Sequence, residues 1–167
     1  MESKAKLFGH SIHQMLIPFP LGLMTTGALF DLIHLLTGNA NWATSSFVVI
    51  LAGVVGGALA AIFGVIDFLA IPTATRAYRI GITHGLGNVL VVILFGASLL
   101  LRMDHRTEPG VLAVGVSLLG AGLGMVTGWL GGELVDRLGV GVDDGANLNA
   151  PSSLSGPAVR ERPVIGD

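Results

Sequence analysis

Histidines are the side chains of this 167-residue chain whose type and spacing point to ligand chemistry. His10 and His13 lie three positions apart in the stretch GHSIHQMLIPFPLG, where a long apolar segment begins. His84 opens a later apolar segment and precedes Asn88 by one helical turn. Neutral imidazoles bind transition metals and haem iron, and a carboxylate can then act as a further ligand or accept the other ring N–H. The chain has no cysteine, which excludes thiolate ligands and iron–sulfur clusters held by this chain alone.

The composition places these residues in a membrane protein. Hydrophobic residues make up 51% of the chain and charged residues 12%, about half the charged fraction of a typical soluble domain. The mean hydropathy is +0.76. The net charge of −2 gives no reason to expect a nucleic-acid partner, so the lipid bilayer is the expected surrounding.

Four apolar runs are long enough to cross a bilayer, which takes about 20 residues of helix. The backbone must satisfy its own hydrogen bonds there, so each run is predicted to be a helix. The expected fold is an all-α integral membrane protein, with four transmembrane helices bundled within residues 1–140. After Gly139 the composition turns to Gly, Asp, Asn, Ser and Pro, which predicts a disordered polar tail over 141–167. The predicted spans are roughly 15–36, 46–70, 82–101 and 111–131.

Four spans place both termini on the same side of the membrane. The opposite side carries Arg102 and Arg106, diluted by Asp104 and Glu108. The positive-inside rule therefore predicts a multi-pass protein of the cytoplasmic (inner) membrane with both termini in the cytoplasm. The basic residues on the side of the termini are Lys4, Lys6, Arg76, Arg79, Arg137, Arg160 and Arg162.

Glycines recur in these runs at the spacing of helix-packing residues, which let neighbouring backbones approach closely. Helices two and four are therefore predicted to carry tightly packed faces, used within the bundle, for self-association or in a larger membrane complex. The fourth run has the i+4 row Gly120, Gly124, Gly128 and Gly132. The second run has two rows, Gly53, Gly57 and Ala61, then Gly56, Ala60 and Gly64.

The order of features indicates a weak internal repeat. His10 and His13 begin helix one, and the glycine-rich helix two ends with Asp67. His84 begins helix three, and the glycine-rich helix four ends with Glu133. Two units of two helices share one orientation, so they would be related by a pseudo-twofold axis along the membrane normal.

Threading the four helices brings one polar set to the cytoplasmic level of the bundle. The candidate ligands are His10, His13 and His84, with Asp67, Asn88 and Glu133 as supporting groups. This set suits either a transition metal or haem b, whose axial ligands would be His84 and one of the other two histidines. The alternative is that the histidines lie at headgroup level, hydrogen-bonded to carboxylates and water. Pro18 and Pro20 favour a helix start, which would leave His10 and His13 in a turn beneath the bundle.

Asp31 and Arg102 are expected to lie at the opposite end, on helices one and three. A buried charge in a membrane needs a partner, so these two residues are predicted to form a structural ion pair. A ligand set of His34 and His105 at this end is the alternative, although His105 lies in a charged loop.

These motifs resemble a bacterial family of small predicted membrane proteins, the domain-of-unknown-function family 2231. Its Gly-His-Pro-Ile-His-Pro opening is similar to residues 9–14, with Ser11 and Gln14 in place of two prolines, and is followed by MLIPFP and Gly22. The resemblance covers about residues 7–140 and implies a four-helix integral membrane protein with no assigned activity. Some relatives join this unit to a Rieske-type iron–sulfur domain, which hints at electron transfer. Further matching residues are Phe30, Asp31, Gly64, Asp67, His84, Asn88, Gly131, Gly132, Glu133 and Leu134.

Three functions are compatible with the sequence. The leading hypothesis is a small redox, metal-binding or haem-binding module of the bacterial inner membrane. The second is a non-enzymatic structural or accessory subunit of a membrane complex, and the third is an ion or proton conductor. No nucleophile–base pair or phosphate loop is present, so an enzyme is not the preferred interpretation.

Overall fold

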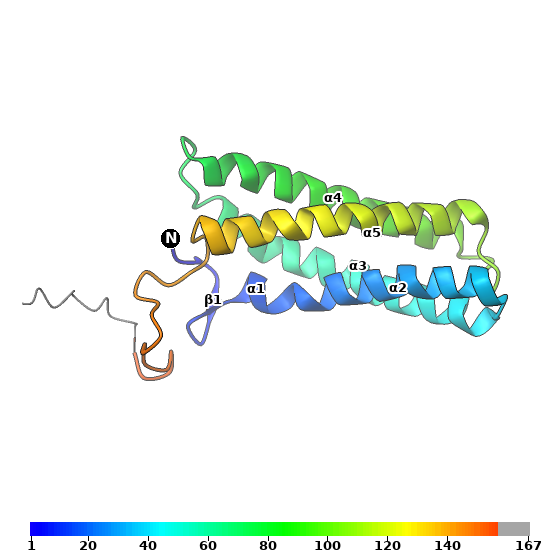
Figure 1. The fold of residues 1–167 in the computed structure, drawn as a ribbon, viewed down its shortest axis with the longest axis horizontal. Helices are drawn as coiled ribbons and strands as arrows, with labels where there is room; N and C mark the ends of the chain where they lie inside the picture. The colour runs from blue at the N-terminus through cyan, green and yellow to red at the C-terminus, as the bar shows by residue number, and fades with distance from the viewer. Residues whose placement is uncertain (157–167) are drawn as a thin grey trace, which may run out of the picture.

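The computed structural model describes residues 1–156 and shows a bundle of four long helices (Figure 1). All four are long and apolar enough to cross a membrane, which confirms the predicted fold class. A two-stranded hairpin and two short helical segments lie at one end of the bundle (Figure 1). The elements are β1 (Lys6–Leu7), β2 (His10–Ser11), α1 (Ile12–Leu16), α2 (Pro18–Thr37), α3 (Ala40–Phe68), α4 (Arg76–Leu101), α5 (Val111–Gly132) and the π-helix η1 (Glu133–Arg137).

Helices α3 and α4 begin about six residues before their apolar runs. The side chain of Asn39 accepts a hydrogen bond from the Asn41 N–H at 2.9 Å. The hydroxyl of Thr75 accepts one from the Tyr78 N–H at 3.1 Å. These caps satisfy backbone donors outside the hydrocarbon region, so the helix starts at its cap and hydropathy marks only the lipid-embedded part.

Helix α2 begins at Pro18, as the prolines predicted, because a proline needs no hydrogen-bond partner in the first turn. The prediction that both histidines lie in a turn was wrong. His10 belongs to strand β2 and His13 to α1, a single helical turn. The Ile17 N–H donates to the His13 carbonyl at 3.1 Å, so α1 leads into α2 with almost no break.

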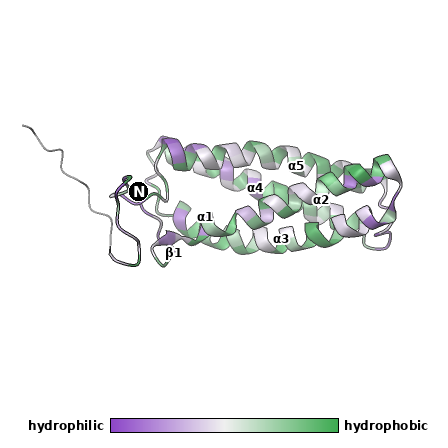
Figure 2. Cartoon of the chain, turned by 60° about the horizontal axis from the view of Figure 1, so that its bottom comes forward, coloured by the Kyte–Doolittle hydropathy of each residue, from purple (hydrophilic) through white to green (hydrophobic). Residues whose placement is uncertain are grey.

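The bundle consists of two antiparallel helix pairs, α2 with α3 and α4 with α5 (Figure 1). Apolar colour covers most of the outward helix faces (Figure 2), where Val55, Ile62 and Ile93 are exposed. In a bilayer these side chains face lipid, so the hydrophobic core between the pairs is small. The core comprises Met24, Ala28, Phe47, Ile50, Val91, Phe95 and Leu99.

The two helix pairs repeat the same packing contacts. A Cβ placed on Gly53 would lie 2.6 Å from the Met24 side chain, and one on Gly120 would lie 3.0 Å from Phe95. Met24 and Phe95 are 71 positions apart, whereas Gly53 and Gly120 are 67 positions apart. The same separations of 71 and 67 positions recur at the end of the bundle that carries the β1–β2 hairpin and η1, which we call the polar end. The pair α4–α5 therefore repeats α2–α3 about an axis along the helices, which supports the repeat expected from the sequence.

The glycine row predicted on α5 faces a neighbouring helix only in part. Gly120 and Gly124 face α4, but no described atom lies within 4 Å of a Cβ on Gly128. A strict i+4 row turns about 40° around a helix at each step, so it leaves the interface after two steps. The packing position near the polar end is Gly131 instead, which faces His84.

Residues 141–156 form no helix or strand. They run back along the N-terminal segment, where the Gly141 N–H donates to the Met1 carbonyl at 2.9 Å. Both described ends of the chain therefore lie at the same end of the bundle (Figure 1). The rest of the predicted disordered tail, 157–167, lies outside the described residues.

Candidate functional site

His13 is held on the α3 surface by its Nδ1 atom. This nitrogen lies 2.8 Å from the Ala60 carbonyl oxygen. A carbonyl can only accept, so Nδ1 carries the proton and Nε2 keeps a free lone pair. A Cβ on Gly64 would lie 2.8 Å from the His13 ring, so the absence of a side chain there makes room for the imidazole. The resulting ring is half-buried and aims its lone pair away from the α3 carbonyl.

His84 is held in the same way on α5. Its Nδ1 lies 2.9 Å from the Thr127 carbonyl, and a Cβ on Gly131 would lie 3.1 Å from its ring. Asn88 donates to the His84 carbonyl at 2.8 Å, and its amide nitrogen lies 3.3 Å from His84 Nε2. The Thr127 hydroxyl donates to Asn88 Oδ1 at 3.1 Å and so orients that amide.

The two histidines are equivalent members of the repeat. His13 and His84 are 71 positions apart, the same separation as Met24 and Phe95 in the core. Their carbonyl partners Ala60 and Thr127 are 67 apart, as are the facing glycines. The structure therefore shows two imidazoles at equivalent positions of the repeat, each with its Nδ1 against a backbone carbonyl of its own helix pair.

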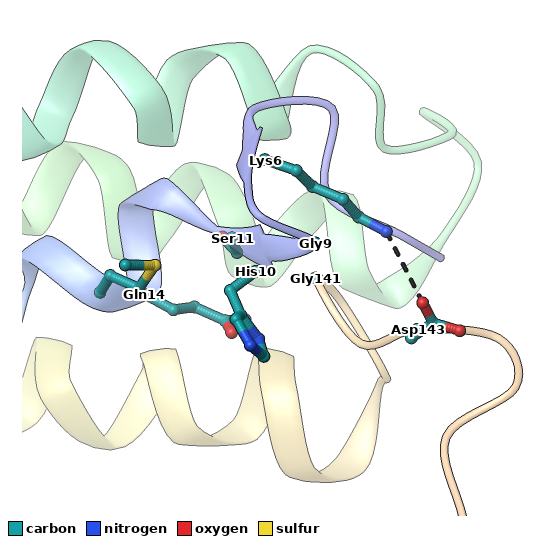
Figure 3. A pocket seen from close by; sticks show the side chains of 8 residues that line it. Lys6, Gly9, His10, Ser11, Gln14, Gly141 and Asp143 are labelled. Atoms are coloured by element: carbon teal, nitrogen blue, oxygen red, sulfur yellow. Dashed lines mark ion pairs between the residues drawn. The ribbon is translucent and has the colours of Figure 1, made fainter. Parts of the chain in front are cut away.

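His10 does not join this pair. It lies on β2, and its Nε2 is 3.3 Å from the Ser153 hydroxyl. Its side chain lines an open pocket of about 260 Å³ between the β1–β2 hairpin and residues 141–143 (Figure 3). Lys6 and Asp143 approach within 3.8 Å across that pocket. The strand directs His10 toward the tail segment, which separates it from the predicted ligand set.

The carboxylates of the polar end hold other partners in the described residues. Asp67 is buried and accepts from Ser3 and from the Lys4 N–H, at 2.8 and 2.7 Å. Glu133 accepts from the Arg76 guanidinium at 2.6 Å, which ties η1 to the start of α4. Neither carboxylate is hydrogen-bonded to a histidine within residues 1–156.

A metal-ion site of three side chains is not assembled in the described chain. Within residues 1–156, no group of three His, Cys, Asp or Glu side chains has the arrangement that a metal ion would need. The expected set of His10, His13 and His84 is reduced to a pair because of the position of β2.

Asp31 and Arg102 meet at the opposite end of the bundle, as predicted. Two parallel hydrogen bonds of 2.6 and 2.8 Å join the guanidinium to the carboxylate, and neither side chain has exposed surface. The remaining guanidinium donors reach the hydroxyls of Ser46 and Ser98 and the Ser98 carbonyl. Every N–H of this buried arginine is thus satisfied, which a charge surrounded by lipid-embedded helices requires.

This ion pair occupies the pseudo-twofold axis, because Asp31 and Arg102 are themselves 71 positions apart. Equivalent positions of the two repeats thus carry opposite charges. The histidines near this end lie outside the pair. His34 Nδ1 is 3.1 Å from the Asn39 carbonyl at the end of α2, and His105 is exposed in the loop before α5. The alternative ligand set of His34 and His105 receives no support.

Residues 9–144 match the sequence profile of a family described as predicted membrane protein, DUF2231. The chain belongs to this family. No significant match was found among curated proteins, and none among solved structures. Membership of DUF2231 agrees with the four membrane-spanning helices and assigns no activity.

Sequence reasoning missed the serines that complete the buried network. Ser46 donates to the Gly27 carbonyl at 2.9 Å, and Ser98 donates to the Ala113 carbonyl at 2.7 Å. Ser117 donates to the Asp31 carboxylate. The available signal was the position of Ser98 and Ser117 as isolated hydroxyls within apolar runs, and of Ser46 at the edge of another run.

Breaking the ion pair from one side should be far more damaging than replacing both partners. We expect Asp31→Ala to lower the free energy of unfolding by roughly 3–5 kcal/mol, because it leaves a buried guanidinium unpaired. The double variant Asp31→Leu with Arg102→Met should lose much less. Thermal unfolding in detergent, followed by circular dichroism, measures both, with exposed Asp104→Ala as the matched control. Equal losses in the single and double variants would contradict this account.

Proposed function

We propose that this protein is a small haem-binding module of the membrane, with His13 and His84 as the two axial ligands. The observation that carries the proposal is the matched pair of imidazoles. Each donates its Nδ1–H to a backbone carbonyl, at 2.8 and 2.9 Å, which leaves Nε2 as the nitrogen that can bind a metal. Histidines that ligate metals almost always donate the other ring N–H in this way, which fixes both tautomer and ring orientation.

The number of ligands favours haem over a bare metal ion. A structural zinc site uses four protein ligands and a catalytic one uses three, whereas haem takes four nitrogens from its own macrocycle. Two histidine ligands would therefore complete the protein's share, and His13 and His84 would supply one from each helix pair. Binding would require the Asn88 amide to leave its 3.3 Å contact with His84 Nε2.

Haem with two histidine ligands has no open coordination position. Such a group supplies one-electron transfer between the ferric and ferrous states and does not bind a substrate at iron. The chain's own contribution is to fix the two imidazoles and to surround them with lipid-embedded helices. Electron transfer is therefore the activity we assign to the proposed module.

The orientation proposed is the one expected from the sequence, with both ends of the chain in the cytoplasm. The buried ion pair strengthens that argument, because Arg102 is neutralised by Asp31 and is no longer a loop charge. Arg106 is the other arginine at the end of the bundle that holds the ion pair, and its guanidinium lies 4.4 Å from the centre of the Phe47 ring. The opposite end keeps exposed basic residues such as Arg79 and Arg137, which favours the cytoplasmic side.

Visible absorption spectra of the detergent-purified protein, saturated with haem, test the function. We expect one haem per chain with the spectrum of a six-coordinate low-spin iron. His13→Ala and His84→Ala should each abolish that spectrum, because each removes one axial ligand. His10→Ala and His34→Ala are matched controls, since those side chains lie outside the pair, and both should retain it. A protein that takes up no haem, or a His10→Ala variant as defective as His13→Ala, would refute the proposal.

A further inference from the structure

Asp67 is a buried carboxylate near the end of α3 that holds the N-terminal segment. Its oxygens accept from the Ser3 hydroxyl at 2.8 Å and from the Lys4 N–H at 2.7 Å. Longer contacts of 3.4 Å come from the Ala5 N–H and the Ser11 hydroxyl. Hydrogen bonds to an ionised acceptor are stronger than neutral ones, so this one side chain fixes a segment that has no helix of its own.

The segment that Asp67 holds is joined directly to His13. The Ala5 carbonyl accepts from the N–H of Ile12, the first residue of α1, at 2.9 Å. His13 is the next residue. Its ring packs over Gly64, which lies three positions before Asp67 on α3. The His13 ring therefore lies against α3 one turn before Asp67. A chain of hydrogen bonds through Ala5 and Ile12 links the two side chains.

We propose that Asp67 is the positioning residue of His13. By holding Lys4 and Ala5 it sets the start of α1, and the start of α1 sets the imidazole against the Ala60 carbonyl. The inference rests on the proposed function only for the identity of the ligand that His13 binds. The positioning itself is a property of the chain and can be measured without that ligand.

His84 provides an internal reference for this effect. The position equivalent to Asp67 in the second repeat is Leu134, which is buried and apolar. His84 instead has Asn88 and Thr127 beside it, both within its own helix pair. Loss of the Asp67 carboxylate should therefore weaken the hydrogen bond from His13 Nδ1 to the Ala60 carbonyl and leave that from His84 Nδ1 to the Thr127 carbonyl unchanged.

The test is solvent exchange of the two ring Nδ1–H protons in the full-length, ¹⁵N-histidine-labelled protein, in the ferrous state if haem is present. In Asp67→Asn we expect exchange at His13 to rise about tenfold or more, since a hydrogen bond to a charged group is lost. Exchange at His84 should not change. Asp136→Asn, which removes an exposed carboxylate at the same end, is the control and should alter neither proton.

Unchanged exchange at His13 in Asp67→Asn would overturn the inference, even if the Lys4 amide became more exposed to solvent. Should that variant fail to fold, Ser3→Ala with Ser11→Ala removes two donors to the carboxylate and must give the same contrast between the histidines. A protein that binds no haem would refute the proposed function alone, because both ring protons can still be compared.

Discussion

The buried ion pair between Asp31 and Arg102 is the constraint on which the arrangement of this bundle depends. Lipid surrounds most of the outer helix surface, so apolar burial gives little direction to the way the two helix pairs meet. A carboxylate and a guanidinium in that environment cannot separate without leaving an unpaired charge. Because they stand at equivalent positions of the repeat, they fix the relative orientation of α2 and α4 at the pseudo-twofold axis. Like charges at these two positions would instead force the repeats apart.

That orientation has its consequence at the opposite end of the bundle. Once the pairs are related by a half-turn, residues of α1 and α4 that are equivalent in the repeat make matching contacts with α3 and α5. The glycines beneath His13 and His84 let each imidazole lie against a helix backbone, where a carbonyl accepts a hydrogen bond from the Nδ1–H. The proposed haem site would therefore need only one histidine from each repeat. The remaining polar groups of this end differ between the repeats and support the two rings in different ways.

Much of this could be read from the sequence, because membrane helices follow from long apolar runs and a buried arginine requires a nearby acid. The proposed ligand pair, His13 with His84, could not be chosen from the sequence. Its choice depends on β2, a two-residue strand that turns His10 toward residues 141–153, and no periodicity in so short an element distinguishes it from a helical turn. The role of Asp67 was also hidden, since its partners lie more than fifty residues away in an irregular segment. The spacing of 71 and 67 positions was present in the sequence, but few identical residues mark it, and only the contacts make it visible.

The account's central claim is that two symmetry-related histidines form one axial ligand pair, and electron paramagnetic resonance of the ferric, haem-saturated protein tests it most directly. Two imidazole ligands on one iron give a low-spin signal. We predict that signal for the full-length chain, at one spin per chain, and its replacement by a high-spin signal when either His13 or His84 is changed. A high-spin signal from the unmodified protein, or a low-spin signal that survives both changes, would contradict the claim.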